Sequence, residues 1–69
     1  MIGARIKQAR EAKGMTQPEL AYIVGVVKHM ITMIERGTRQ VTAPLLVVLA
    51  EVLDVTADWL LYGDRDKGD

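Results

Sequence analysis

The sequence predicts an all-α domain built from five short helices. Apolar residues recur three or four positions apart along most of the chain, which is the period of an amphipathic helix, and no stretch shows the alternation of a half-buried strand. Glycines, and threonines followed two residues later by proline, stand where such helices end and begin. The 69 residues suffice for one small domain, and the absence of cysteine excludes disulfides and cysteine-bound zinc.

The first two helices are predicted from their ends. Residues 2–12 carry apolar side chains at helical spacing, and Gly14 follows in the position of a left-handed cap. The run from Thr16 to Glu19 reads as a capping box, in which the threonine hydroxyl accepts from the third amide and the glutamate reaches back. We therefore expect a second helix over residues 17–24.

A third helix is expected from about Val27 to Arg36, closed by Gly37. Only a few residues around Gly25 separate it from the second helix, which is typical of the turn in a helix-turn-helix unit.

The last two helices are expected over residues 42–53 and 56–61, each begun by a capping threonine. Residues 1–63 then form the folded domain, and residues 64–69 form a charged tail that we expect to be disordered.

The charge distribution favours a polyanionic partner, although the formal net charge is zero. Residues 1–40 carry seven basic and three acidic side chains, whereas residues 41–69 carry two basic and six acidic ones. This asymmetry indicates one face directed toward a polyanion and another turned away from it.

Several classes of function are excluded by what the sequence lacks. It has no serine or cysteine, one histidine and no glycine-rich phosphate loop, so we expect no enzyme, metal site, cofactor or small-molecule ligand. The longest apolar stretch, Leu45 to Ala50, is too short for a membrane span, and Arg5 and Lys7 interrupt any apolar leader. We expect the protein to be cytoplasmic.

Seven stretches of the chain resemble the Cro and repressor helix-turn-helix family, which includes the DNA-binding domains of lambdoid phage repressors. They are Ile6–Arg10, Gly14–Ala21, Gly25–Val26, Ile31, Ile34–Gly37, Leu49–Ala50 and Asp58–Leu61. The resemblance covers residues 2–63 and rests on the order and spacing of these stretches. It implies a five-helix repressor-like domain, with the helix-turn-helix at helices 2 and 3, that binds operator DNA and regulates transcription, as a repressor. Because one recognition helix covers only a few base pairs of double-stranded DNA, we expect a homodimer that reads a palindromic operator.

The sequence departs from the family pattern in three places. Val27 stands where a capping serine or threonine is usual, and Asp54 stands where a glycine usually precedes the last helix. Met30 and Met33 interrupt recognition positions that are usually polar or basic.

The third helix has two faces at 100° per residue. Its outward face carries Lys28, His29, Thr32, Met33 and Arg36, and its inward face carries Val27, Met30, Ile31 and Ile34. Lysine, histidine and threonine supply hydrogen-bonding groups for base edges, and methionine fits against a thymine methyl. The resemblance implies base-reading roles for Lys28, His29, Thr32 and Met33. The alternative is that this face is only the solvated side of an amphipathic helix.

Residues around the third helix are candidates for contacting phosphate or positioning the helix: Gln17, Arg10, Arg36, Arg39, Gln40 and Thr42. Gln17 would either contact phosphate or support the first recognition residue. The resemblance also implies a structural ion pair between Arg10 and Glu35, the alternative being two independent surface charges.

A dimer interface is expected in the acidic C-terminal half. Val48, Val52, Trp59 and Leu60 are the candidate contacts, because the fourth helix is apolar nearly all round. The alternative is that the valines only shield the core.

A rival interpretation is a helix-turn-helix domain that binds another protein rather than DNA. It is favoured by the zero net charge, by Met33 and by Tyr22 and Ile23, which stand on the second helix where polar residues are expected.

Overall fold

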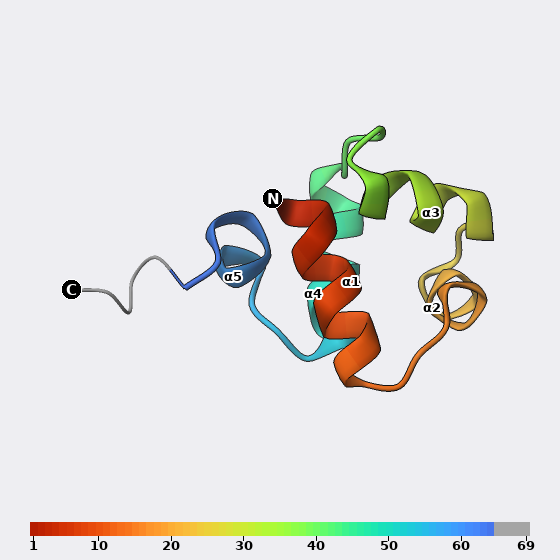
Figure 1. The fold of residues 1–69 in the computed structure, drawn as a ribbon, viewed down its shortest axis with the longest axis horizontal. Helices are drawn as coiled ribbons and strands as arrows, with labels where there is room; N and C mark the ends of the chain where they lie inside the picture. Colours follow the sequence, from red (N-terminus) through yellow and green to blue (C-terminus); the bar gives the residue numbers. More distant parts are fainter. Residues whose placement is uncertain (65–69) are drawn as a thin grey trace.

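The computed structural model describes residues 1–64, which form the expected all-α fold of five helices (Figure 1). The helices are α1 (Ile2–Ala12), α2 (Gln17–Val24), α3 (Lys28–Arg36), α4 (Ala43–Leu53) and α5 (Ala57–Tyr62). Their bounds lie within about a residue of the predicted ones. The predicted tail begins at Asp64, and the residues that follow Asp64 lie outside the described part of the chain.

The helix ends follow the capping chemistry of the sequence. The Thr16 hydroxyl accepts from the Glu19 amide at 3.2 Å, and the Thr16 amide donates to Glu19 Oε1 at 2.8 Å. Hydrogen bonding of the Glu19 carboxylate to the Thr16 amide first, and to the Thr16 side chain second, holds the pKa of Glu19 below its ordinary value. Val27 begins α3 without a side-chain cap. Asp54, with φ of 60°, takes the left-handed conformation that the family usually gives to glycine.

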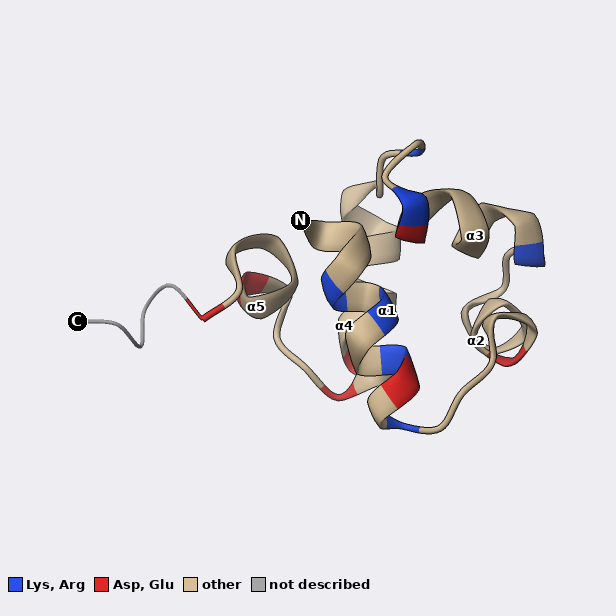
Figure 2. Ribbon diagram, viewed as in Figure 1, with Lys and Arg blue, Asp and Glu red and all other residues tan. Residues whose placement is uncertain are grey.

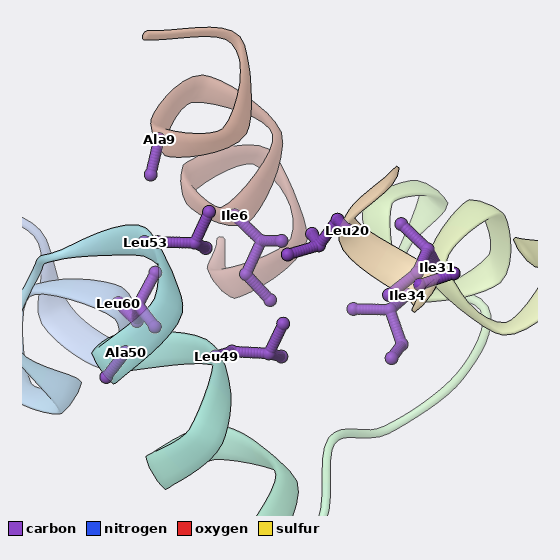
Figure 3. Close-up of a cluster of buried hydrophobic side chains, with 10 residues drawn as sticks. Ile6, Ala9, Leu20, Ile31, Ile34, Leu49, Ala50, Leu53 and Leu60 are labelled. Carbon is purple, nitrogen blue, oxygen red and sulfur yellow. The ribbon is translucent and has the colours of Figure 1, made fainter. Parts of the chain in front are cut away.

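All five helices contribute to one aliphatic core. Figure 3 shows Ile6 of α1 between Leu20, Leu49 and Leu53. The largest fully buried side chains are Ile6, Leu20, Ile31, Ile34, Leu49 and Leu60. Because every helix loses part of its core when another is removed, we expect the domain to fold as a single unit.

The core corrects one of the predicted dimer contacts. The prediction that Leu60 lies at a dimer interface is wrong, because its side chain is 0% exposed and fills the core beneath α5. A six-residue helix needs such an anchor, since it has too few residues to be stable alone.

Gly3 lets α1 approach the C-terminal end of α3 at close range. A Cβ placed on Gly3 would lie 2.8 Å from the Glu35 backbone oxygen and closer still to that of Ile34. Gly3 was not among the residues expected to matter. Its one signal in the sequence is that it is a glycine inside a helix, which is unfavourable unless a neighbouring backbone needs the space.

Arg5 joins α1 to the end of α5. Its Nε donates to the Leu60 carbonyl at 2.8 Å and its Nη2 to the Leu61 carbonyl at 2.7 Å. These carbonyls belong to the last turn of α5, where helical partners are lacking. Arg5 therefore caps α5.

Arg10 and Glu35 form a buried ion pair between α1 and α3. Arg10 Nε lies 2.7 Å from Glu35 Oε2, and the two side chains are 9% and 4% exposed. A second bond joins Nη2 to Oε1 at 3.1 Å, and Nη1 donates to the Met15 carbonyl at 2.7 Å. The hydrogen bond to Glu35 raises the pKa of Arg10, although burial opposes the shift.

This geometry corrects the predicted phosphate role of Arg10. Its three guanidinium nitrogens all donate within the protein, and the whole residue is only 7% exposed. Arg10 is a structural residue that holds α3 against α1.

Replacing Glu35 with alanine should lower the free energy of unfolding by about 3 kcal/mol, because it leaves the Arg10 guanidinium buried without its counter-charge. Replacing Arg10 with methionine, and then both residues together, completes a double-mutant cycle measured by urea denaturation. Additive effects in the double variant would show that the pair does not couple α1 to α3.

Replacing Gly3 with alanine should lower the free energy of unfolding by about 1 to 3 kcal/mol, although alanine is the better helix former. The cause is the collision of the new methyl group with the backbone of α3. Ala4→Gly, at the exposed neighbouring position, measures only the difference in helix propensity between alanine and glycine. A Gly3→Ala protein more stable than the parent would refute the close approach.

Candidate nucleic-acid interface

A turn of three residues connects α2 to α3. In Figure 1, α2 is seen end-on while α3 lies across the view at the edge of the molecule. Gly25 closes α2 with φ of 84°, and the amides of Gly25 and Val26 both donate to the Ala21 carbonyl, at 2.9 and 3.0 Å. A residue with a side chain would be strained at this φ, so the glycine sets the direction in which α3 leaves.

The two faces of α3 differ as the sequence predicts except at Val27, for which the predicted inward position is wrong: it precedes the first turn of α3 and is 71% exposed. Ile31 and Ile34 are buried in the core, at 0% and 1% exposure. The side chains of Lys28, His29 and Arg36 are exposed, and those of Thr32 and Met33 are half-buried. Met30 packs against the core instead of occupying an outward position.

Gln17, at the start of α2, is hydrogen-bonded to two residues of α3. Its Nε2 donates to Glu35 Oε1 at 3.0 Å, and its Oε1 accepts from the Thr32 hydroxyl at 2.9 Å. Gln17 was predicted to support the first recognition residue, Lys28. Its side chain instead bonds to Thr32. A chain of hydrogen bonds runs from Arg10 through Glu35 and Gln17 to Thr32.

The loop that follows α3 exposes three of the predicted phosphate contacts, Arg39, Gln40 and Thr42. With Val26, Met30 and the start of α4, they line a shallow groove. The Thr42 oxygen accepts from the Leu45 amide at 3.4 Å, which leaves its hydroxyl hydrogen free to donate outward.

Helices α1 and α3 carry both basic and acidic residues, whereas α4 and α5 carry acidic residues and no basic ones (Figure 2). Lys28 and Arg36 lie on α3 and Arg39 in the loop after it, and all three are exposed. The described acidic residues of the C-terminal half lie on or beside α4 and α5: Glu51, Asp54, Asp58 and Asp64. Because Arg10 is neutralised by Glu35, it adds nothing to the positive surface.

A second surface, on α2, is apolar. The side chains of Tyr22 and Ile23 are 87% and 51% exposed, and with Met15, Pro18 and the stem of Glu19 they line a shallow groove. This surface is separate from the charged face of α3.

Two further findings concern the described residues as a whole. None of their helices combines the length and the apolar composition needed to cross a membrane. Residues 1–64 also contain no cluster of three or more histidine and acidic side chains placed to share a metal ion.

Comparison with known proteins gives consistent matches. A family model described as Helix-turn-helix matches residues 6–60. The HTH-type transcriptional regulator DicA of Escherichia coli strain K12 is 35% identical over 66 residues, which make up 96% of this chain and 49% of DicA. The chain spans about half the length of the first curated relatives it matches.

Two solved structures share the fold closely. The P22 c2 repressor in complex with a synthetic operator has a TM-score of 0.87 at 30% identity, over 91% of this chain and 96% of that one. SinR of Bacillus subtilis, in complex with DNA, has a TM-score of 0.83 at 42% identity, over 88% and 98%. The matched family model covers most of the chain, and the matched structures reproduce the order and placement of its five helices. The chain therefore belongs to the Cro- and repressor-type helix-turn-helix family.

Proposed function

We propose that this domain binds operator DNA sequence-specifically, with α3 in the major groove, and acts in the cytoplasm as a homodimeric transcriptional regulator, most simply a repressor. The observation that carries the proposal is the outward face of α3, where exposed Lys28, His29 and Arg36 flank Thr32 on a helix fixed to its neighbours by buried bonds. Solved relatives bound to DNA support it. The relatives named above are regulators, not enzymes.

Base edges are read by Lys28, His29, Thr32 and Met33 in this proposal. Lys28 and His29 have free side chains that reach beyond the helix surface. Met33 is half-buried, so its outer atoms offer an apolar contact of limited reach, suited to a thymine methyl. Arg36, Arg39, Gln40 and Thr42 contact phosphate and fix the register.

Lys28→Ala and Thr32→Ala should each change the preferred bases and cost about 1 to 3 kcal/mol against the cognate site. Arg39→Ala should weaken binding to all sequences alike. It should also reduce, by about one, the slope of the logarithm of the binding constant against the logarithm of the salt concentration. Selection from a random duplex library, followed by titrations at several salt concentrations, measures both effects.

Lys13→Ala is the matched control for Lys28→Ala and Arg39→Ala, since it removes an exposed cation at the end of α1 with the same change in net charge. An unchanged motif and affinity in both Lys28→Ala and Thr32→Ala would show that α3 does not read DNA.

The homodimer is proposed to form through Val48, Val52 and Trp59. The side chain of Val48 is 37% exposed, and Val52 and Trp59 are half-buried at the edge of the core. Val48 also lines the groove that contains Arg39, Gln40 and Thr42, so this part of the surface adjoins the proposed phosphate contacts. Two domains related by a twofold axis would place their α3 helices about 34 Å apart, one turn of DNA.

A full palindrome should bind two domains cooperatively, and Val48→Ala should weaken the cooperativity while leaving half-site affinity within about threefold, because it adds no charge beside Arg39. Val47→Ala is the matched control, because Val47 is a neighbouring valine of α4 that is 54% exposed and lies outside the proposed contact. The measurement is a titration of a palindrome and of an isolated half-site. Equal affinity per half-site in the parent protein would exclude the dimer.

Binding to another protein is the second candidate function, and the exposed apolar groove on α2 is the observation that favours it. This groove is separate from the charged face of α3, so a protein contact there would leave α3 open to DNA. Loss of partner binding in Tyr22→Ala with an unchanged DNA motif would assign the two functions to separate surfaces.

A further inference from the structure

The neighbours of the Thr32 hydroxyl fix the direction in which it donates its hydrogen bond. A hydroxyl carries one hydrogen and two lone pairs, so it can donate once and accept twice. Its oxygen lies 2.9 Å from Gln17 Oε1 and 3.3 Å from the backbone oxygen of Lys28. Both neighbours are acceptors. The Gln17 oxygen is the nearer of the two, and while the hydroxyl donates to it the hydrogen points into the protein and only accepting capacity remains outward.

The orientation of the Gln17 amide is fixed by charge. Its Nε2 donates at 3.0 Å to Glu35 Oε1, which also accepts from Arg10 Nη2 at 3.1 Å. Turning the amide over would bring its oxygen against the carboxylate oxygen and its NH₂ group against the hydroxyl. The Arg10 guanidinium donates to the same carboxylate, so the turned orientation would set the amide oxygen against a carboxylate oxygen and is repulsive.

We propose that Gln17 and Glu35 are positioning residues that make Thr32 a one-way reader, which accepts a hydrogen bond from the amino group of adenine or cytosine and donates none to a base. An unconstrained threonine serves either acceptor or donor edges, whereas adenine N6 and cytosine N4 are the major-groove donors. Guanine O6, thymine O4 and the purine N7 atoms would face the threonine oxygen with like partial charge.

This inference rests on the proposed binding of DNA by α3. It adds that Thr32 accepts a hydrogen bond rather than donating one, which the residue type alone does not determine. The direction comes from Arg10, two hydrogen-bonded residues away from Thr32. A buried ion pair that looks purely structural thereby sets which chemical group the surface of α3 can recognise.

Base analogues supply the test, because every base pair has both a donor and an acceptor in the major groove. In the selected site, purine replaces each adenine and 2-pyrimidinone each cytosine, which removes one amino donor at a time. At one position the parent protein should lose about 5- to 10-fold in affinity. Thr32→Val, which keeps the shape without the hydroxyl, should bind the natural site correspondingly more weakly and show no further loss there.

7-Deazapurines form the opposite arm, since each removes a major-groove acceptor. Their effect should be the same in the parent and in Thr32→Val. A deazapurine effect that disappears in Thr32→Val, or amino deletions that cost both proteins equally at every position, would overturn the proposal. If the parent selects no motif from a random library, the proposed function fails and the inference fails with it.

Gln17→Leu tests the positioning role, because it removes the nearer acceptor and leaves the Thr32 hydroxyl only the longer, 3.3 Å contact with the Lys28 backbone oxygen. The 5- to 10-fold preference for the amino donor should fall below about 3-fold at the Thr32 position only, while preferences elsewhere in the motif persist. Gln8→Leu, at an exposed glutamine of α1, is the matched control. An equal loss of affinity at every position, with the preference intact, would give Gln17 a merely structural or phosphate-binding role.

Discussion

The buried ion pair between Arg10 and Glu35 is the interaction on which the placement of α3 depends. Two charged side chains removed from water are tolerated only if they satisfy one another, and here the guanidinium has three good acceptors. The pair does more than hold two helices together. It holds a carboxylate beneath the surface of α3, and that carboxylate orients Gln17 and, through it, Thr32.

Contacts of α1 with the ends of two other helices also hold the domain together. Gly3 allows α1 to lie against the last turn of α3, and Arg5 closes the last turn of α5 from the same helix. Because α1 also carries Ile6 into the core, it contacts α3, α4 and α5. Lys28, His29 and Arg36 can therefore remain exposed and polar, since none of them is needed to hold α3 in place.

Surfaces of different chemistry divide the domain. The cationic residues near α3, the acidic residues of α4 and α5, and the apolar groove on α2 lie on different elements. A zero net charge therefore conceals an arrangement that is far from neutral locally, and local charge is what a nearby polyanion experiences at physiological ionic strength.

The sequence by itself determined the helices and most of the inward-facing residues, because capping, glycine punctuation and apolar period are local properties of the chain. Tertiary structure decided the rest. Leu60 shares helical spacing with residues that stay partly exposed, and only packing showed that it fills the core. Likewise, residue type does not reveal that Arg10 is enclosed, that Gly3 meets a backbone, or which way the Thr32 hydroxyl points. Each depends on atoms brought together from distant parts of the chain, whose distances no local pattern encodes.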